Sequence, residues 1–124
     1  MTGKKALLDS NIIIYISKQE LPLAFIEQFD EIYISAISYM EILGYAFQDK
    51  DEEDYLRELL SVFMVIYIGP EISEITIGIR KENKIKLPDA IIAATAIAEN
   101  LHLVTRNTSD FKQIDVELIN PFEQ

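Results

Sequence analysis

The sequence of 124 residues has no cysteine and only one histidine, His102. The absence of cysteine excludes disulfides, thiolate zinc sites and cysteine nucleophiles. Acid–base catalysis by two histidines is impossible, and a Ser-His-Asp triad would need His102. Because His102 stands between Leu101 and Leu103 in a predicted strand, we interpret it as a packed structural residue rather than a catalytic one.

Glycines and long apolar runs are also scarce. The four glycines, at positions 3, 44, 69 and 78, are scattered, which excludes a P-loop and a G-x-G-x-x-G nucleotide site. No apolar run approaches the roughly 18 residues that span a bilayer, and the first residues lack the apolar segment of a signal peptide. We therefore expect a soluble cytoplasmic protein without membrane contact, with residues 1–124 forming one domain.

Positive charge is limited: 11 Lys and Arg stand against 21 Asp and Glu, a formal net charge of -10. This balance argues against a passive phosphate binder, but not against a nuclease whose carboxylates hold metal cations. Four of the basic residues fall within positions 80–86, namely Arg80, Lys81, Lys84 and Lys86. The run is either a solvated helix end and loop, or a surface that carries RNA toward the neighbouring Asp89.

Apolar and β-branched runs predict strands at 5–8, 31–35, 64–68, 101–105 and 116–119. Helical spacing predicts helices at 12–16, 21–29, 38–47, 55–63, 70–79 and 87–100. We expect strand 64–68 to be buried on both faces, strand 116–119 to lie at an edge, and the acids at 49–54 to form a solvated helix N-terminus. Strands alternating with helices indicate an α/β fold, because parallel strands need crossover connections.

Four carboxylates are predicted at strand ends or in the helix turns that follow them: Asp9, Glu41, Asp89 and Asp110. Ligands of open α/β sheets bind in the crevice outside the carboxyl ends of the strands. Each acid also has an ordinary structural interpretation. Asp9 could be a helix N-cap, Asp89 a first-turn acid that matches the helix dipole, and Glu41 the partner of Ser38 in a capping box, which the local sequence favours.

Four carboxylates at one sheet edge would repel each other and raise each other's pKa values unless cations lie between them. The arrangement therefore predicts a metal site. Ligation by oxygen alone, without His or Cys, favours Mg²⁺ or Mn²⁺ over zinc. Helix N-termini directed at the same point would help to attract phosphate.

The segments around these acids resemble the PIN-domain ribonucleases, and most closely the VapC-type toxins of prokaryotic toxin–antitoxin modules. The segments are LLDSN at 7–11, SYMEIL at 38–43, LPDAIIAATA at 87–96 and LVTRNTSDF at 103–111. The resemblance implies a single domain with a mostly parallel central sheet of four to five strands and helices on both faces. It also implies endoribonuclease activity dependent on Mg²⁺ or Mn²⁺, homodimers, and toxin–antitoxin hetero-oligomers with a cognate VapB-type antitoxin.

By motif position, the resemblance implies that Asp9 and Asp89 are the principal metal ligands, that Glu41 and Asp110 complete the acidic site, and that Asn11, Thr105 and Asn107 give polar support. We expect the antitoxin to place an Arg or Lys among the four acids. A partner helix is expected to pack near Ile12, Ile16 and the segment 43–47, where apolar residues exceed what one small core hides.

A signalling module of the receiver type, with Asp9 as phosphoacceptor, is the alternative from another class. That class normally has paired acids after the first strand and a lysine after the last strand, whereas Ser10 and Asn11 follow Asp9 here. A D-x-D phosphatase would need an acid in place of Asn11. A PIN scaffold without catalytic activity stays open as a further alternative.

Overall fold

Five strands form one parallel sheet in the order β3-β2-β1-β4-β5. The structure is a computed structural model and describes residues 3–123. The strands are β1 (Lys5–Leu8), β2 (Glu31–Ser35), β3 (Met64–Ile66), β4 (His102–Val104) and β5 (Leu118–Ile119). The α-helices are α1 (Ser10–Ser17), α2 (Ala36–Leu43), α3 (Lys50–Leu60), α4 (Pro70–Glu82) and α5 (Leu87–Glu99). Three short 3₁₀ helices are η1 (Leu23–Gln28), η2 (Thr108–Phe111) and η3 (Pro121–Glu123).

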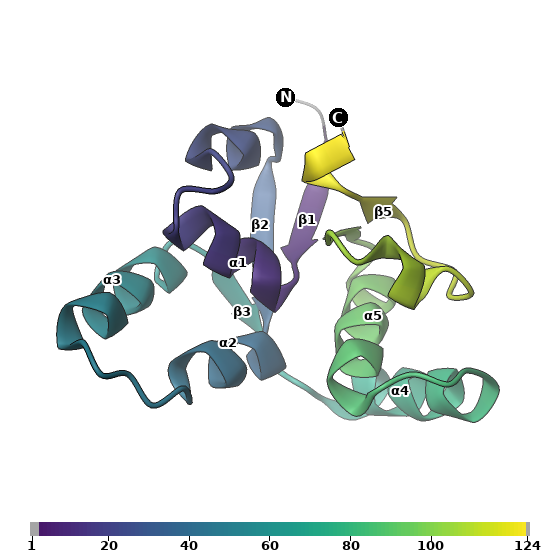
Figure 1. Cartoon of the computed structure of the whole chain (residues 1–124). Helices are drawn as coiled ribbons and strands as arrows, with labels where there is room; N and C mark the ends of the chain where they lie inside the picture. The colour runs from purple at the N-terminus through teal and green to yellow at the C-terminus, as the bar shows by residue number, and fades with distance from the viewer. Residues whose placement is uncertain (1–2, 124) are drawn as a thin grey trace.

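Helices cover both faces of the sheet, as predicted (Figure 1). Successive residues of a strand point to opposite faces, so Leu8 packs with α1, α2 and α3 while Leu7 packs with α4 and α5. Both leucines are fully buried. The two apolar layers explain why the central strands read as continuous apolar runs.

Helix α5 is the buried helix that the sequence predicts. Its residues from Ala90 to Ala96 are buried, and Asn100 ends the helix in the left-handed conformation with φ of 56°. Asparagine tolerates this conformation better than most residues, which explains the sharp stop. Within residues 3–123, no helix has the length and apolar character needed to cross a membrane.

Several predicted elements are wrong in detail. The helix expected at 21–29 is the 3₁₀ helix η1, and strand β3 lies at the sheet edge with Met64 exposed rather than buried on both faces. Ile12 and Ile16 are 0% and 4% exposed, so they belong to the core and cannot meet a partner helix. Burial on α1 was misjudged because its neighbours α2 and α3 are distant in sequence.

The helix expected at 38–47 spans Ala36–Leu43 instead. Ser35 is its N-cap, since the Ser35 hydroxyl accepts a hydrogen bond from the Ile37 N–H at 3.2 Å. Gly44 is the C-cap, and its N–H donates to the Met40 carbonyl at 2.8 Å. The capping box of Ser38 with Glu41 is therefore wrong, because Ser38 lies inside the helix.

The strand order of the sheet reverses between β1 and β4, which are parallel neighbours. From β1 the chain adds β2 and β3 on one side, and it later returns to add β4 and β5 on the other. Such a reversal leaves a crevice at the carboxyl ends of the two strands. Asp9 follows β1 at this crevice, and its N–H donates to the Val104 carbonyl at 3.0 Å.

Candidate active site

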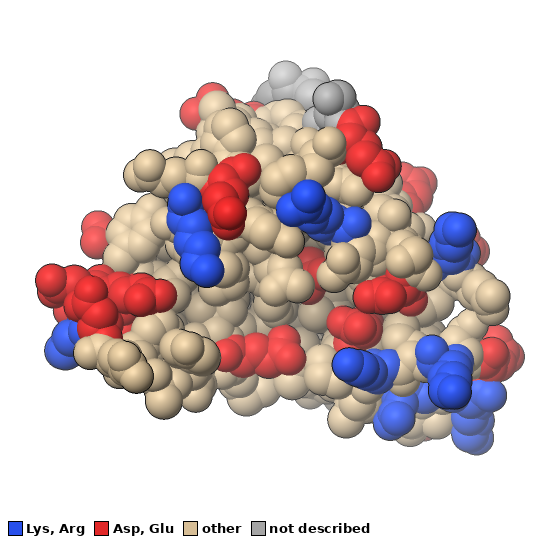
Figure 2. Space-filling view, in the orientation of Figure 1, with Lys and Arg blue, Asp and Glu red and all other residues tan. Residues whose placement is uncertain are grey.

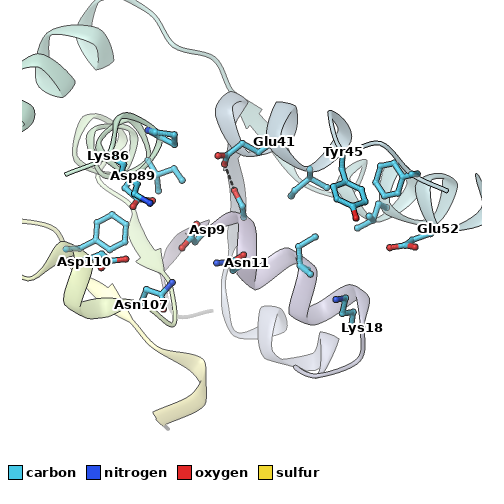
Figure 3. A pocket seen from close by; sticks show the side chains of 18 residues that line it. Asp9, Asn11, Lys18, Glu41, Tyr45, Glu52, Lys86, Asp89, Asn107 and Asp110 are labelled. Atoms are coloured by element: carbon cyan, nitrogen blue, oxygen red, sulfur yellow. Dashed lines mark hydrogen bonds between the residues drawn. The ribbon is translucent and has the colours of Figure 1, made fainter. Parts of the chain in front are cut away.

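A cavity of about 600 Å³ lies at the carboxyl edge of the sheet and is lined by all four predicted acids. Asp9 comes from the end of β1, Glu41 from α2, Asp89 from the first turn of α5 and Asp110 from η2. In Figure 3, Asp9 lies between Glu41 on one side and the Asp89 and Asp110 pair on the other. Asn11 and Asn107 line the same cavity. The fold thus brings together residues that are up to 101 positions apart in sequence (Asp9 and Asp110).

Asp9 is buried, with 8% of its surface exposed, and it does not act as a helix cap. It occupies the N-cap position of α1, but its side chain makes no capping hydrogen bond. Instead its Oδ2 accepts a hydrogen bond from the Thr105 hydroxyl at 2.9 Å. Thr105 is itself fully buried, and its Oγ1 accepts from the Asn107 N–H at 3.1 Å. Thr105 therefore fixes the Asp9 carboxylate from behind without lining the cavity.

Burial is the main cause that raises the pKa of Asp9. The hydrogen bonds from Thr105 and from the Ser10 backbone act in the opposite direction, and the charges of Glu41 and Asp110 add to the increase. The pKa of Asp89 is raised as well, first by burial and then by Asp9, Asp110 and Glu41. The acids are thus close enough to oppose each other's ionisation.

Glu41 does not take part in helix capping, because α2 begins at Ala36 and Ser35 is its N-cap. Its Oε1 lies 3.0 Å from the Ser10 hydroxyl, the contact drawn as a dashed line in Figure 3. Glu41 is exposed and faces the cavity from the side opposite Asp89. The predicted capping role of Glu41 is wrong because Ser35, not Ser38, is the N-cap of α2.

The donor set fits a hard divalent cation, because the cavity offers carboxylate oxygens and no nitrogen or sulfur of His or Cys. Across the described residues 3–123, no three or more His, Cys, Asp or Glu side chains form a ready-made metal-binding group. Mg²⁺ commonly keeps several waters and takes only one or two carboxylates together with substrate phosphates. The cavity therefore suits an ion that keeps part of its hydration shell.

A second cavity of about 510 Å³ adjoins the first and shares Lys86, Asp89 and Asp110 with it. Lys84 and Lys112 also line this second cavity, whereas Arg80 and Lys81 are exposed in the last turn of α4 and line neither. Figure 2 shows basic side chains gathered over the corner where α4 and α5 lie. Two lysines that line the cavities, Lys18 and Lys112, were missed in the sequence, because isolated lysines carry no local signal.

His102 lies away from the acidic cavity. It begins β4 and pairs with Ala6, so it lies at the amino ends of the strands, whereas Asp9 follows the carboxyl end of β1. It is half-buried rather than fully packed, and its Nε2 lies 2.6 Å from Glu117 Oε2. Neither the first nor the second cavity includes it.

Comparisons with known proteins identify the family of this chain. The model of the PIN domain family matches residues 6–117. "Ribonuclease VapC" of Rickettsia bellii is 30% identical, over 87% of this chain and 89% of the relative. Among solved structures, a toxin–antitoxin complex from Klebsiella pneumoniae is 37% identical with a TM-score of 0.77, covering 94% of this chain and 97% of that one. VapBC2 from Rickettsia felis, bound to a DNA fragment from their promoter, is 26% identical with a TM-score of 0.82, covering 94% and 98%.

The raised pKa of Asp9 predicts how stability without metal depends on pH. The folded chain holds the Asp9 proton more tightly than the unfolded chain, so stability falls as pH rises from the ordinary value of 3.8 through the raised pKa. Asp9→Asn keeps the shape and removes the charge. We expect the variant to exceed the wild type in free energy of unfolding at neutral pH, with a smaller decline across this window. Urea denaturation in EDTA at several pH values measures both.

Asp115→Asn is the matched control, because Asp115 is exposed and lines neither acidic cavity. It should leave the pH profile of the wild type unchanged. A loss of stability in Asp9→Asn at neutral pH would contradict the argument from burial.

Proposed function

This chain belongs to the PIN-domain family, and on that premise we propose that it is a metal-dependent endoribonuclease toxin of the VapC type. The observation that carries the proposal is the meeting of four carboxylates in one cavity at the sheet reversal point. The similarity to a ribonuclease VapC over most of both chains supports the reaction class. The receiver-type alternative is set aside because the family is a different one.

We propose that Asp9 and Asp89 are the principal ligands of one Mg²⁺ or Mn²⁺ ion and that Glu41 and Asp110 complete the site. Raised pKa values at Asp9 and Asp89 support this assignment, since a cation would relieve the burial and repulsion that cause them. When bound, such an ion supplies Lewis-acid activation of the phosphodiester and of a water nucleophile.

The chain's own residues do the positioning. Thr105 holds Asp9 in one orientation, and Asn107 holds the Thr105 hydroxyl through its backbone N–H. We propose that Asn11 and Asn107, which line the cavity, orient the RNA backbone or water through their amides. A fixed site of this kind aligns the scissile phosphate at the carboxylates without reorganisation during the reaction.

Removing one ligand charge at a time tests the reaction. Asp9→Asn and Asp89→Asn should each reduce RNA cleavage at least about a hundredfold, because an amide replaces a metal-binding charge while the shape is kept. Cleavage of structured RNA with Mg²⁺ or Mn²⁺, and with EDTA as the blank, measures the effect.

His102→Ala is the control for this experiment, because His102 lies at the amino ends of the strands, away from the acidic cavity. It should keep cleavage near the level of the wild type. Either Asn variant retaining near-normal metal-dependent activity would refute the ligand assignment, and a selective loss of turnover in folded His102→Ala would indicate histidine chemistry instead.

We propose that RNA approaches over the second cavity, along Lys84 and Lys86, and reaches the acids through Lys86. Charge reversal at Lys84 and Lys86 should weaken RNA binding. The slope of log affinity against log salt concentration should decrease by the amount expected for the loss of roughly two phosphate contacts. Titrations at several salt concentrations measure the slope, with inactive Asp9→Asn as the background.

Reversal at Arg80 and Lys81 is the matched control of equal charge, because these residues line neither cavity. We expect a smaller loss of affinity there. Equal effects in both double variants would mean that only net charge matters, and no effect in either would reduce the whole run to a solvated surface.

We further propose that a VapB-type antitoxin inhibits the chain by placing an Arg or Lys among the four acids. The similarity to solved toxin–antitoxin complexes supports such a partner. A guanidinium pairs with carboxylates in a bidentate manner and takes the place of a divalent cation. The apolar part of the contact would use Met40 and Tyr45, which are 55% and 69% exposed. The homodimer implied by the resemblance stays a prediction.

Neutralising the basic residues of the antitoxin tail should restore cleavage, and excess Mn²⁺ should weaken inhibition by the native tail. A cleavage assay of the complex reads out both. Inhibition that ignores metal concentration and survives neutralisation of every basic residue in the tail would rule out this mechanism.

A further inference from the structure

Two serine hydroxyls connect α1 and α2 beside the acidic cavity. Ser10 is the first residue of α1, and Ser38 lies in the first turn of α2 with none of its surface exposed. The Ser10 Oγ lies 2.9 Å from the Ser38 Oγ and 3.0 Å from Glu41 Oε1. The three side chains form a short chain of hydrogen bonds that runs from the core to the cavity.

Several other Ser and Thr hydroxyls in the α-helices bond to a carbonyl of the preceding turn. Ser73, Thr76 and Thr95 each donate to the carbonyl four residues earlier, at 2.9, 2.7 and 2.7 Å. This local bond is the common one for a helical Ser or Thr. Ser38 instead meets a residue 28 positions away. The departure from the local bond occurs next to the acids, as it does for Thr105 and Asp9.

The chemistry of the groups gives this chain a direction. An ionised carboxylate can only accept hydrogen bonds, so the single Ser10 proton is best used toward Glu41. The Ser38 hydroxyl can then donate to the Ser10 oxygen, which leaves the Ser10 proton directed at Glu41. Ser38 is buried, and across the described residues every buried side-chain nitrogen or oxygen has a partner. Ser38 therefore depends on Ser10 for the pairing that burial demands.

We propose that Ser10 and Ser38 are positioning residues that hold the Glu41 carboxylate in the cavity. Glu41 is exposed and has a long, flexible side chain, so without Ser10 it would sample solvent-facing rotamers. The inference rests on the proposed function, in which Glu41 completes the site of a divalent cation. It adds the residues that decide whether Glu41 is available to that cation.

Manganese binding to the purified protein tests the proposal without any measurement of RNA cleavage. Ser10→Ala and Ser38→Ala should each weaken Mn²⁺ affinity about tenfold, as expected when a partner of a ligand is removed. Ser10→Thr, which keeps the hydroxyl, should restore most of the affinity. Ser73→Ala is the matched control, since it removes a helix hydroxyl that bonds only to its own helix. Electron paramagnetic resonance of free Mn²⁺ measures the affinities, and thermal unfolding confirms that the variants fold.

The same titrations in a Glu41→Gln background separate positioning from a general structural effect. If the serines act through Glu41, then Ser10→Ala causes no further loss once Glu41 is replaced. An equal loss with and without Glu41 would overturn the inference. If Ser38→Ala fails to fold, Ser10→Ala with its Thr rescue decides alone.

Failure of the inference and failure of the proposed function give different results. Weaker Mn²⁺ binding in Glu41→Gln together with wild-type binding in Ser10→Ala overturns only the role of the serines. Binding unchanged in Glu41→Gln removes Glu41 from the metal site, and the positioning role falls with it.

Discussion

Repulsion among carboxylates is the constraint on which the rest of the site depends. The reversal of strand order between β1 and β4 creates the crevice, and the segments after β1, β2 and β4 bring acids to it. Burial and mutual charge raise the pKa values of Asp9 and Asp89, so the folded chain disfavours the ionised form of both carboxyls. In the proposed function, a bound cation compensates these unfavourable charges. In the proposed function, a divalent cation or an antitoxin guanidinium would relieve the same repulsion, so catalysis and inhibition would compete for one position.

The acids are held by side chains that differ from their surroundings in how they bond. Thr76 and Thr95 donate to carbonyls of their own helices. Thr105 and Ser10 bond across the fold to Asp9 and Glu41. These two bonds join acids from different segments, the β1–α1 junction and α2, to one cavity. The apolar layers on both faces of the sheet provide the rigidity that such bonds require, because close packing resists small displacements.

Basic side chains gather at one corner of an acidic protein (Figure 2). The molecule is acidic as a whole, yet basic side chains gather over the corner of α4 and α5, next to Asp89 and Asp110 (Figure 2). Lys86 joins the two cavities. In the proposed function, the lysines at this corner would direct RNA to the acidic cavity beside them.

The sequence by itself determined the parallel α/β fold, the buried helix α5 and the identity of the four acids. These follow from local patterns, namely apolar runs, helix starts after strands and acids at strand ends. Tertiary structure decided the rest. Ser35, not Ser38, caps α2, which frees Glu41 for Ser10. β3 is an edge strand, and Ile12 and Ile16 belong to the core. Lys112 lines the second cavity together with Asp89, and no sequence motif predicts this position. The physical reason is that strand order and helix packing join segments far apart in sequence, whereas sequence patterns report only the residues within a few turns of each other.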